Sequence, residues 1–177
     1  MTEPSDADFA AFVRVHSTAL LRSAFLLAGN RVDAEELVQD TLVRLFPKWQ
    51  QVQAADVPLA YVRRSLTNNF LNGRRRRSAS DLLFAEPPER GYEPDFGDRI
   101  TDQDLVRELL EGLTAKQRAV LVLRYYDDLD DIEIAEIVGC RRGTVRSIIS
   151  RSLSQLRHET GRRAADHQAP QTNGHAR

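Results

Sequence analysis

The sequence has few residues of the kinds that form cross-links or bind metal ions. Cys140 is the single cysteine among 177 residues, which excludes an internal disulfide. The four histidines, His16, His158, His167 and His175, include no helical i, i+4 pair with a carboxylate between them. We therefore expect neither a metal site nor a cofactor.

Long apolar runs and a secretory signal are lacking as well. No run approaches the roughly 20 apolar residues that a membrane-spanning helix needs. The N-terminus, MTEPSDADFAAF, is acidic and has no basic stretch followed by an apolar core. With 41% apolar and 29% charged residues, the composition favours a water-soluble globular protein. We expect a cytoplasmic protein without membrane insertion.

Helical periodicity fills the first part of the chain. The apolar residues of 37–46 lie on one helical face. Asp33 is predicted to cap this helix, with Glu36 completing a capping box, and Pro47 is predicted to end it. The pattern of residues 9–28 predicts an earlier helix.

Two further signals divide this first part. Gly29 and Asn30 are predicted to stop the earlier helix. Pro58 is predicted to open another helix, in which apolar residues repeat every four positions until Gly73. Residues 1–77 therefore form a small all-helical domain.

Aperiodic segments separate and follow a second domain. Residues 78–102 contain three prolines and two glycines without a sustained period, which predicts a flexible linker. Helical periodicity resumes in residues 103–162, where Thr114 and Gln117 form a capping-box signal. The polar residues 163–177 are predicted to be a disordered tail. The fold class is all-α, with two small helical domains.

The stretch DIEIAEIVGCRRGTVRSIIS, residues 131–150, has the spacing of a helix-turn-helix. Gly139 permits a left-handed turn between two helices. Val145 and Ile148 are placed to bury the second helix against Ile134 and Val138. An ordinary helical bundle is the alternative interpretation.

Charge favours the helix-turn-helix. Residues 125–136 carry six acids and no base, whereas arginines dominate from Arg141 onwards. A basic helix beside an acidic neighbour suits phosphate attraction, and this helix is predicted to enter a major groove. The candidates for base or phosphate contacts are Arg142, Thr144, Arg146, Ser147, Ser150 and Arg151.

A second set of candidates lies in the first domain. Residues 61–77 combine aromatic rings, side-chain amides and arginines without an acid. Aromatic rings can stack unpaired bases, and amides can bond exposed base edges, so this mixture suits single-stranded nucleic acid. The candidates are Tyr61, Arg64, Asn68, Arg74, Arg75, Arg76 and Arg77. A solvated basic helix end is the alternative for the run of arginines.

The motifs of both domains resemble one family. DAEELVQDTLVRLF, residues 33–46, resembles region two of the extracytoplasmic-function (ECF) group of sigma-70 factors, of the SigE-like actinobacterial type. Residues 58–77 resemble the promoter-melting segment that follows it. GTVRS, residues 143–147, resembles the recognition helix of region four. The resemblance implies a non-enzymatic transcription initiation factor whose linker threads toward the RNA exit channel.

The resemblance also assigns partners. It implies core RNA polymerase, bound at its clamp helices and flap, and promoter DNA, both duplex and melted non-template strand. Glu36, Gln39 and Asp40 would dock on the clamp helices, and Asn68 would lie beside a flipped-out base of the minus-ten element. Arg146, Ser147 and Arg151 fall at minus-thirty-five contacts. We expect weak promoter binding by the free protein and an anti-sigma partner over the region-two face.

Two other classes of function compete with this interpretation. A free-standing helix-turn-helix regulator would bind duplex DNA tightly as a dimer without polymerase. A nucleic-acid enzyme would need a nucleophile with a base, or carboxylates clustered for a metal. The acids of residues 127–131 are clustered but have neither histidine nor a glycine loop beside them, which disfavours the enzyme.

Overall fold

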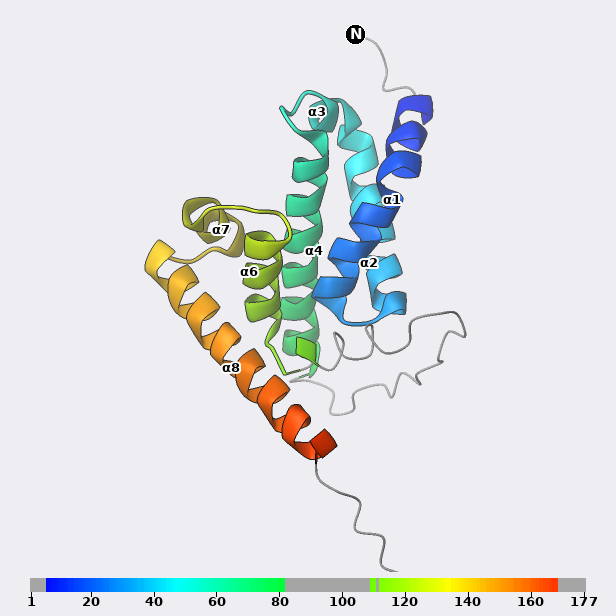
Figure 1. Cartoon of the computed structure of the whole chain (residues 1–177). Helices are drawn as coiled ribbons and strands as arrows, with labels where there is room; N and C mark the ends of the chain where they lie inside the picture. The colour runs from blue at the N-terminus through cyan, green and yellow to red at the C-terminus, as the bar shows by residue number, and fades with distance from the viewer. Residues whose placement is uncertain (1–5, 82–108, 111, 169–177) are drawn as a thin grey trace, which may run out of the picture.

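The chain forms two groups of helices that lie side by side (Figure 1). The computed structural model describes residues 6–81, 109–110 and 112–168, with the backbone alone for 75–81 and 163–168. Throughout these ranges the regular structure is helical and no strand occurs, which confirms the all-α class.

The first group is built on four α-helices and one 3-10 turn. These are α1 (Asp6–Ala28), α2 (Arg31–Leu45), η1 (Phe46–Lys48), α3 (Trp49–Gln53) and α4 (Pro58–Asp81). The predicted stop at Pro47 is confirmed, since α2 gives way to the short η1 turn there. The fully buried side chains at the centre include Leu20, Leu27, Val52, Val62 and Leu66.

Helix α2 begins earlier in the sequence than predicted, directly after the turn that ends α1. Gly29 has φ +86°, as expected for the residue that ends α1. Asn30 then caps α2, because its backbone is extended and its side chain accepts a hydrogen bond from the Asp33 N–H at 2.9 Å. The prediction that Asp33 and Glu36 form the capping box is therefore wrong. Asp33 is already inside the helix, where its carboxylate accepts from the Asn30 amide at 3.0 Å.

Helix α4 begins at Pro58, as predicted, but does not end at Gly73. Its buried residues Val62, Leu66 and Phe70 repeat every four positions, which confirms the predicted face. The helix continues to Asp81, so the first residues of the predicted linker, 78–81, are helical. A glycine inside a helix costs only about 1 kcal/mol, which residues on either side can offset. The rest of the linker lies outside the described residues.

The second group comprises α6 (Ala115–Tyr125), α7 (Asp131–Val138) and α8 (Arg142–Gln168). The capping box at Thr114 is confirmed, with its hydroxyl 3.2 Å from the Gln117 N–H and a return bond of 2.8 Å. Because α8 runs to Gln168, the tail predicted from residue 163 is wrong for 163–168. Residues 169–177 lie outside the described part of the chain.

The two groups share a hydrophobic core. Ala119 and Val122 of α6 are buried in the same cluster as Leu27 of α1. Leu71 of α4 packs against this cluster and also against the smaller core of the second group. In Figure 1, α6 accordingly lies between α4 and α8. The domains are therefore packed together rather than only tethered.

Helix α1 is long and apolar enough to cross a membrane by length and composition alone, although polar residues interrupt its apolar sequence. Core helices of globular proteins meet the same two criteria. Three of its side chains, Leu20, Ala24 and Leu27, have no exposed surface and belong to the shared core.

Candidate nucleic-acid interface

Helix α7 is fixed at its start by a second capping box. The Asp130 carboxylate accepts hydrogen bonds from the Ile132 and Glu133 N–H groups at 2.8 and 2.9 Å. The Glu133 side chain accepts in return from the Asp130 N–H at 3.1 Å. We did not predict this cap, although the Asp-x-x-Glu spacing in the sequence would have indicated it.

The turn between α7 and α8 has the geometry of a helix-turn-helix. Gly139 ends α7 with φ +68°, and its N–H donates to the Ala135 carbonyl. Val145, in the first turn of α8, is fully buried in one cluster with Ile134 and Val138. Ile148 is partly buried against the same cluster. The predicted helix pair and its contacts are confirmed.

The outward side of α8 presents every candidate that we placed there. The exposed residues are Arg142, Thr144, Arg146, Ser147, Ser150 and Arg151. Two of them bond to their own helix, as the Ser147 hydroxyl donates to the Gly143 carbonyl at 3.1 Å and Arg151 Nε to the Ser147 carbonyl at 3.3 Å. All six side chains on this side of α8 are polar or basic.

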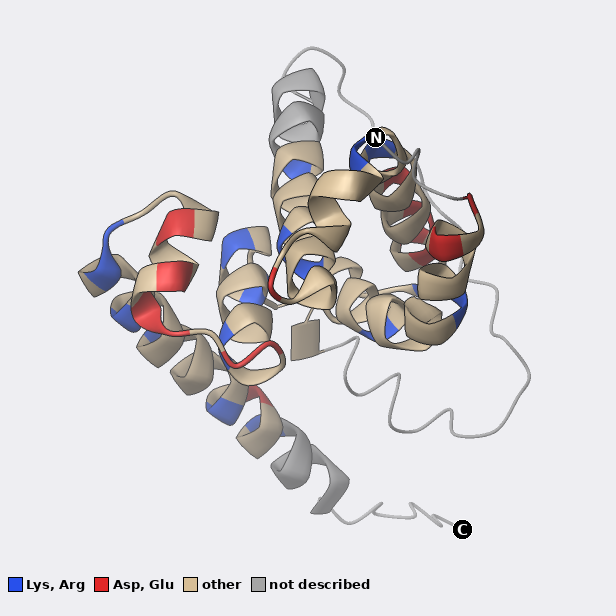
Figure 2. Cartoon of the chain, turned by 90° about the horizontal axis from the view of Figure 1, so that it is seen from above, with Lys and Arg blue, Asp and Glu red and all other residues tan. Residues whose placement is uncertain are grey.

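Charges of opposite sign lie on adjacent helices. Figure 2 shows acids gathered on α7 and on the loop before it, and basic residues along α8. The acidic and basic blocks of the sequence therefore also lie on different helices in the fold. An anionic ligand is attracted to α8 and repelled by its neighbour.

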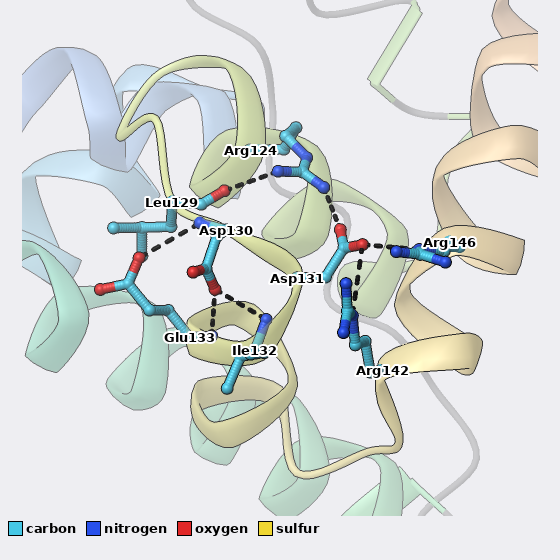
Figure 3. Close-up of polar contacts among 8 residues, drawn as sticks. All are labelled: Arg124, Leu129, Asp130, Asp131, Ile132, Glu133, Arg142 and Arg146. Carbon is cyan, nitrogen blue, oxygen red and sulfur yellow. Dashed lines mark hydrogen bonds and ion pairs between the residues drawn. The ribbon is translucent and has the colours of Figure 1, made fainter.

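Asp131, the first residue of α7, joins three arginines (Figure 3). One carboxylate oxygen accepts from Arg124 of α6, and the other accepts from Nε of Arg146 at 2.7 Å. Arg142 Nε lies 3.9 Å from the second oxygen. The hydrogen bond from Arg146 is the main cause that lowers the pKa of Asp131, and the nearby positive charges of Arg124, Arg146 and Arg142 add to it. Periodicity gave no signal for this network, since its members come from three helices.

On α4, the candidates for single-stranded nucleic acid divide into two groups. Tyr61, Asn68 and Arg74 are exposed, and the Arg74 guanidinium lies 5.9 Å from the centre of the Phe70 ring. Arg64 instead pairs with Glu133 of α7 at 2.5 Å. The side chains of Arg75, Arg76 and Arg77 lie outside the described residues.

The polymerase-docking candidates share one side of α2. Glu36, Gln39 and Asp40 are exposed. Glu36 and Asp40 also line a hollow of about 260 Å³ between α2 and α4. The other residues lining it are Asp33, Leu37, Arg44, Asn69, Phe70, Asn72, Gly73 and Arg74. The acidic docking candidates therefore lie next to Arg74 of α4, which is exposed.

A second ion pair crosses between the two groups of helices. Arg63 Nη1 of α4 lies 3.4 Å from the Asp127 carboxylate, and its guanidinium lies 5.1 Å from the centre of the Tyr126 ring. The Asp127 side chain is only 7% exposed. Burial raises its pKa to about 6, although the charge of Arg63 acts in the opposite direction. Sequence reasoning missed this contact, because its partners are far apart along the chain.

Comparison with known proteins matches both domains. The Sigma-70 region 2 family matches residues 12–80, and the Sigma-70 region 4 family matches residues 109–158. The RNA polymerase sigma-E factor of Streptomyces coelicolor is 33% identical over 162 residues, which cover 92% of this chain and 91% of that protein. These matches disfavour a free-standing regulator with a single helix-turn-helix domain.

Two further relatives are also sigma factors. The ECF RNA polymerase sigma factor SigE of Mycolicibacterium smegmatis is 34% identical over 152 residues, covering 82% of this chain and 58% of that protein. The sigma factor RpoE of Bartonella quintana, solved in complex with the anti-sigma factor NepR, superposes with a TM-score of 0.64 at 28% identity. That match covers 85% of this chain and 95% of the other. The chain therefore belongs to the sigma-70 family and is an RNA polymerase sigma factor of the extracytoplasmic-function group.

Proposed function

We propose that this sigma factor divides its contacts among three helices. The outward side of α8 reads the minus-thirty-five element, α4 binds the melted minus-ten element, and the exposed side of α2 docks on the clamp helices of core RNA polymerase. The observation that carries the proposal is the outward side of α8, where six polar or basic candidates are exposed while Val145 is fully buried behind them.

For the upstream element, arginine and hydroxyl side chains along the start of α8 suit a major groove. An arginine fork can donate two hydrogen bonds to a guanine edge, whereas a contact to phosphate positions the helix without specifying sequence. Arg146 lies in the first turns of α8 and is the candidate for base contact. Arg151 lies further along the helix and is the candidate for phosphate contact.

For the melted element, Asn68 and Tyr61 support binding of an unpaired strand. Both are exposed on α4, with Tyr61 two turns before Asn68. An amide can bond the Watson–Crick edge of an unstacked base, and an aromatic ring can stack on it. Exposed Arg74, followed in sequence by Arg75, Arg76 and Arg77, supplies charge for the DNA backbone.

The acidic and amide side chains of α2 support docking on the clamp helices of the polymerase. The domain that contains α8 would contact the flap. The Bartonella quintana relative was solved with an anti-sigma factor, which supports a partner of the same kind for this chain. We place this partner over the side of α2 that carries Glu36, Gln39 and Asp40. The factor acts in the cytoplasm without catalysing a reaction of its own.

Mapping transcript starts tests the whole proposal. Core RNA polymerase transcribes fragmented genomic DNA with and without the factor. We expect starts that appear only with the factor and share two upstream sequence motifs. The absence of new starts, together with tight duplex binding by the factor alone, would instead support a free-standing regulator.

A further inference from the structure

The Asp131 network differs from an ordinary surface ion pair in its burial. The Asp131 side chain is 10% exposed, whereas those of Arg142 and Arg146 are 58% and 62% exposed. A buried carboxylate thus anchors two solvent-exposed arginines that both belong to the candidate DNA surface. Exposed pairs contribute little because two long side chains must be ordered, but here one partner is already fixed.

Arg124 of α6 holds the Asp131 carboxylate in position. Arg124 donates to one oxygen of the carboxylate and also to the Leu129 carbonyl at 3.0 Å. Its own side chain is 30% exposed. The other oxygen of Asp131 remains available for α8, so the carboxylate bridges α6 and α8 through the start of α7 (Figure 3).

The atoms used by Arg146 matter for its chemistry. Its Nε donates to Asp131 at 2.7 Å, and among the described residues its terminal nitrogens make no hydrogen bond. The two hydrogen bonds that arginine donates to a guanine edge need a fork of two donors, and the terminal nitrogens supply one. A guanidinium held at Nε keeps this fork and loses rotational freedom, which lowers the entropic cost of binding.

We propose that Asp131 is a positioning residue for reading the upstream promoter element, holding Arg146 by its Nε so that the terminal nitrogens face one base pair. This inference rests on the proposed role of Arg146. Asp131 itself touches no DNA. Its negative charge slightly opposes phosphate binding, so its contribution is to sequence discrimination rather than to affinity.

The test measures discrimination by the holoenzyme. Core polymerase is assembled with wild-type or variant factor, and its affinity is measured for a promoter found by start mapping. The same promoter is then tested with each single base pair of the upstream element replaced. The ratio of the two affinities gives the discrimination at each position. Circular dichroism and thermal melting check that each variant is folded.

We expect R146A to abolish discrimination at one base pair. D131N should lower discrimination at that same base pair about three- to tenfold, the size of coupling expected between residues in contact. In the double variant, D131N should add almost nothing to the effect of R146A. The matched control is E136Q, which removes one charge from an exposed site on the same helix and should leave every ratio unchanged.

The outcomes that overturn the inference can be distinguished from one another. In the first, R146A abolishes discrimination at one base pair, but D131N raises the affinity for all sequences equally. E136Q should have that same effect, so Asp131 would then act only through its charge. If R146A itself changes no ratio, the proposed role of Arg146 fails, and the positioning role fails with it. If D131N does not fold, D131E is tested in its place, because glutamate keeps the negative charge but displaces the carboxylate. Retained discrimination in D131E would overturn the proposal.

Discussion

Nη1 of Arg118, in α6, lies 3.1 Å from the carbonyl oxygen of Leu27, near the end of α1. The same nitrogen also donates to the Ala28 carbonyl at 3.3 Å. Helix α1 has no basic residue in its last turn, so a cation from the other domain satisfies these carbonyls. Arg118 is only 8% exposed, so this polar contact lies inside the boundary between the two domains.

Replacing Arg118 with alanine should loosen the two domains. The change leaves buried carbonyls without their charged donor, so we expect the free energy of unfolding to fall by about 2 kcal/mol. Urea denaturation measures this loss, and small-angle X-ray scattering should show a larger radius of gyration. The control is Lys116→Ala, at an exposed position of the same helix. An unchanged urea midpoint and radius would contradict a stabilising role for Arg118.

Asp127 should make stability depend on pH in a defined window. Its pKa in the folded protein is about 6, above the ordinary value of 3.8, so the folded state binds the proton more tightly. Stability should therefore decrease as the pH rises from about 4 to about 6 and stay level above that. Allowing for solvent screening, we expect a change of about 1–2 kcal/mol.

The variant Asp127→Asn isolates this effect, because asparagine does not titrate. The difference in unfolding free energy between variant and wild type should shift in favour of the variant from pH 4 to pH 6. Asp131 has a lowered pKa, so its stabilisation is present above about pH 4 and is lost only as the pH falls further. That contribution is common to both proteins and cancels. A difference that does not change with pH would contradict the raised pKa of Asp127.

Alanine at the two turn glycines should have unequal costs. Gly139 has φ +68° and open space around the missing Cβ, so Gly139→Ala should cost about 1–2 kcal/mol, from backbone strain alone. Gly29 has φ +86°, and a Cβ there would lie 3.2 Å from Arg118 Nη1. Gly29→Ala should therefore destabilise the protein more and also weaken the domain contact. Equal melting temperatures for the two variants would argue against that added contact.

Asn68→Ala should impair promoter melting. If the amide bonds an unpaired base, its removal should reduce open complexes by about tenfold, the loss expected for one base-edge contact. Permanganate reactivity of unpaired thymines measures the open complex. The matched control is Gln53→Ala, which removes an exposed amide from α3 of the same domain. Equal melting by both variants would remove Asn68 from the proposed contact.

Asp40→Arg should weaken assembly with core polymerase. The substitution reverses a charge on the proposed docking surface and places a third base beside Arg44 and Arg74 in the hollow. We expect at least about tenfold weaker binding from misplaced like charges. Fluorescence anisotropy of labelled factor with core enzyme, without DNA, gives the affinity. Asp56→Arg, in the exposed loop before α4, is the charge-matched control, and equal affinity for both variants would move the docking surface elsewhere.

The elements that local sequence determines were predicted well. Pro58 and Thr114 begin helices where expected, and Gly139 ends α7, because caps and left-handed turns depend on a few adjacent residues. The errors have the same local origin. Gly73 is predicted to end α4, but the helix continues through it to Asp81. Asn30 was assigned to the end of one helix, although its side chain begins the next.

The contacts between helices were not predictable in this way. The sequence alone indicated that Asp127 and Glu133 belong to an acidic block, but not that they pair with Arg63 and Arg64 of α4. Asp131 likewise gave no sign of its bond to Arg146, fifteen positions away in sequence. Such pairs depend on how helices pack, which no periodicity describes. The roles of the exposed candidates for DNA and polymerase contacts came from the resemblance to ECF sigma factors. Exposure alone does not identify what a side chain binds.

The pairing of Arg64 with Glu133 makes two equilibria of this factor interdependent. Arg64 lies on α4 among the candidates for melted DNA, and Glu133 lies on α7 of the other domain. Any anion that takes the place of Glu133 on Arg64 weakens the contact between the domains. By thermodynamic reciprocity, closure of the domains weakens binding of that anion by the same factor. Binding of an anion at Arg64 and separation of the two domains would therefore increase together.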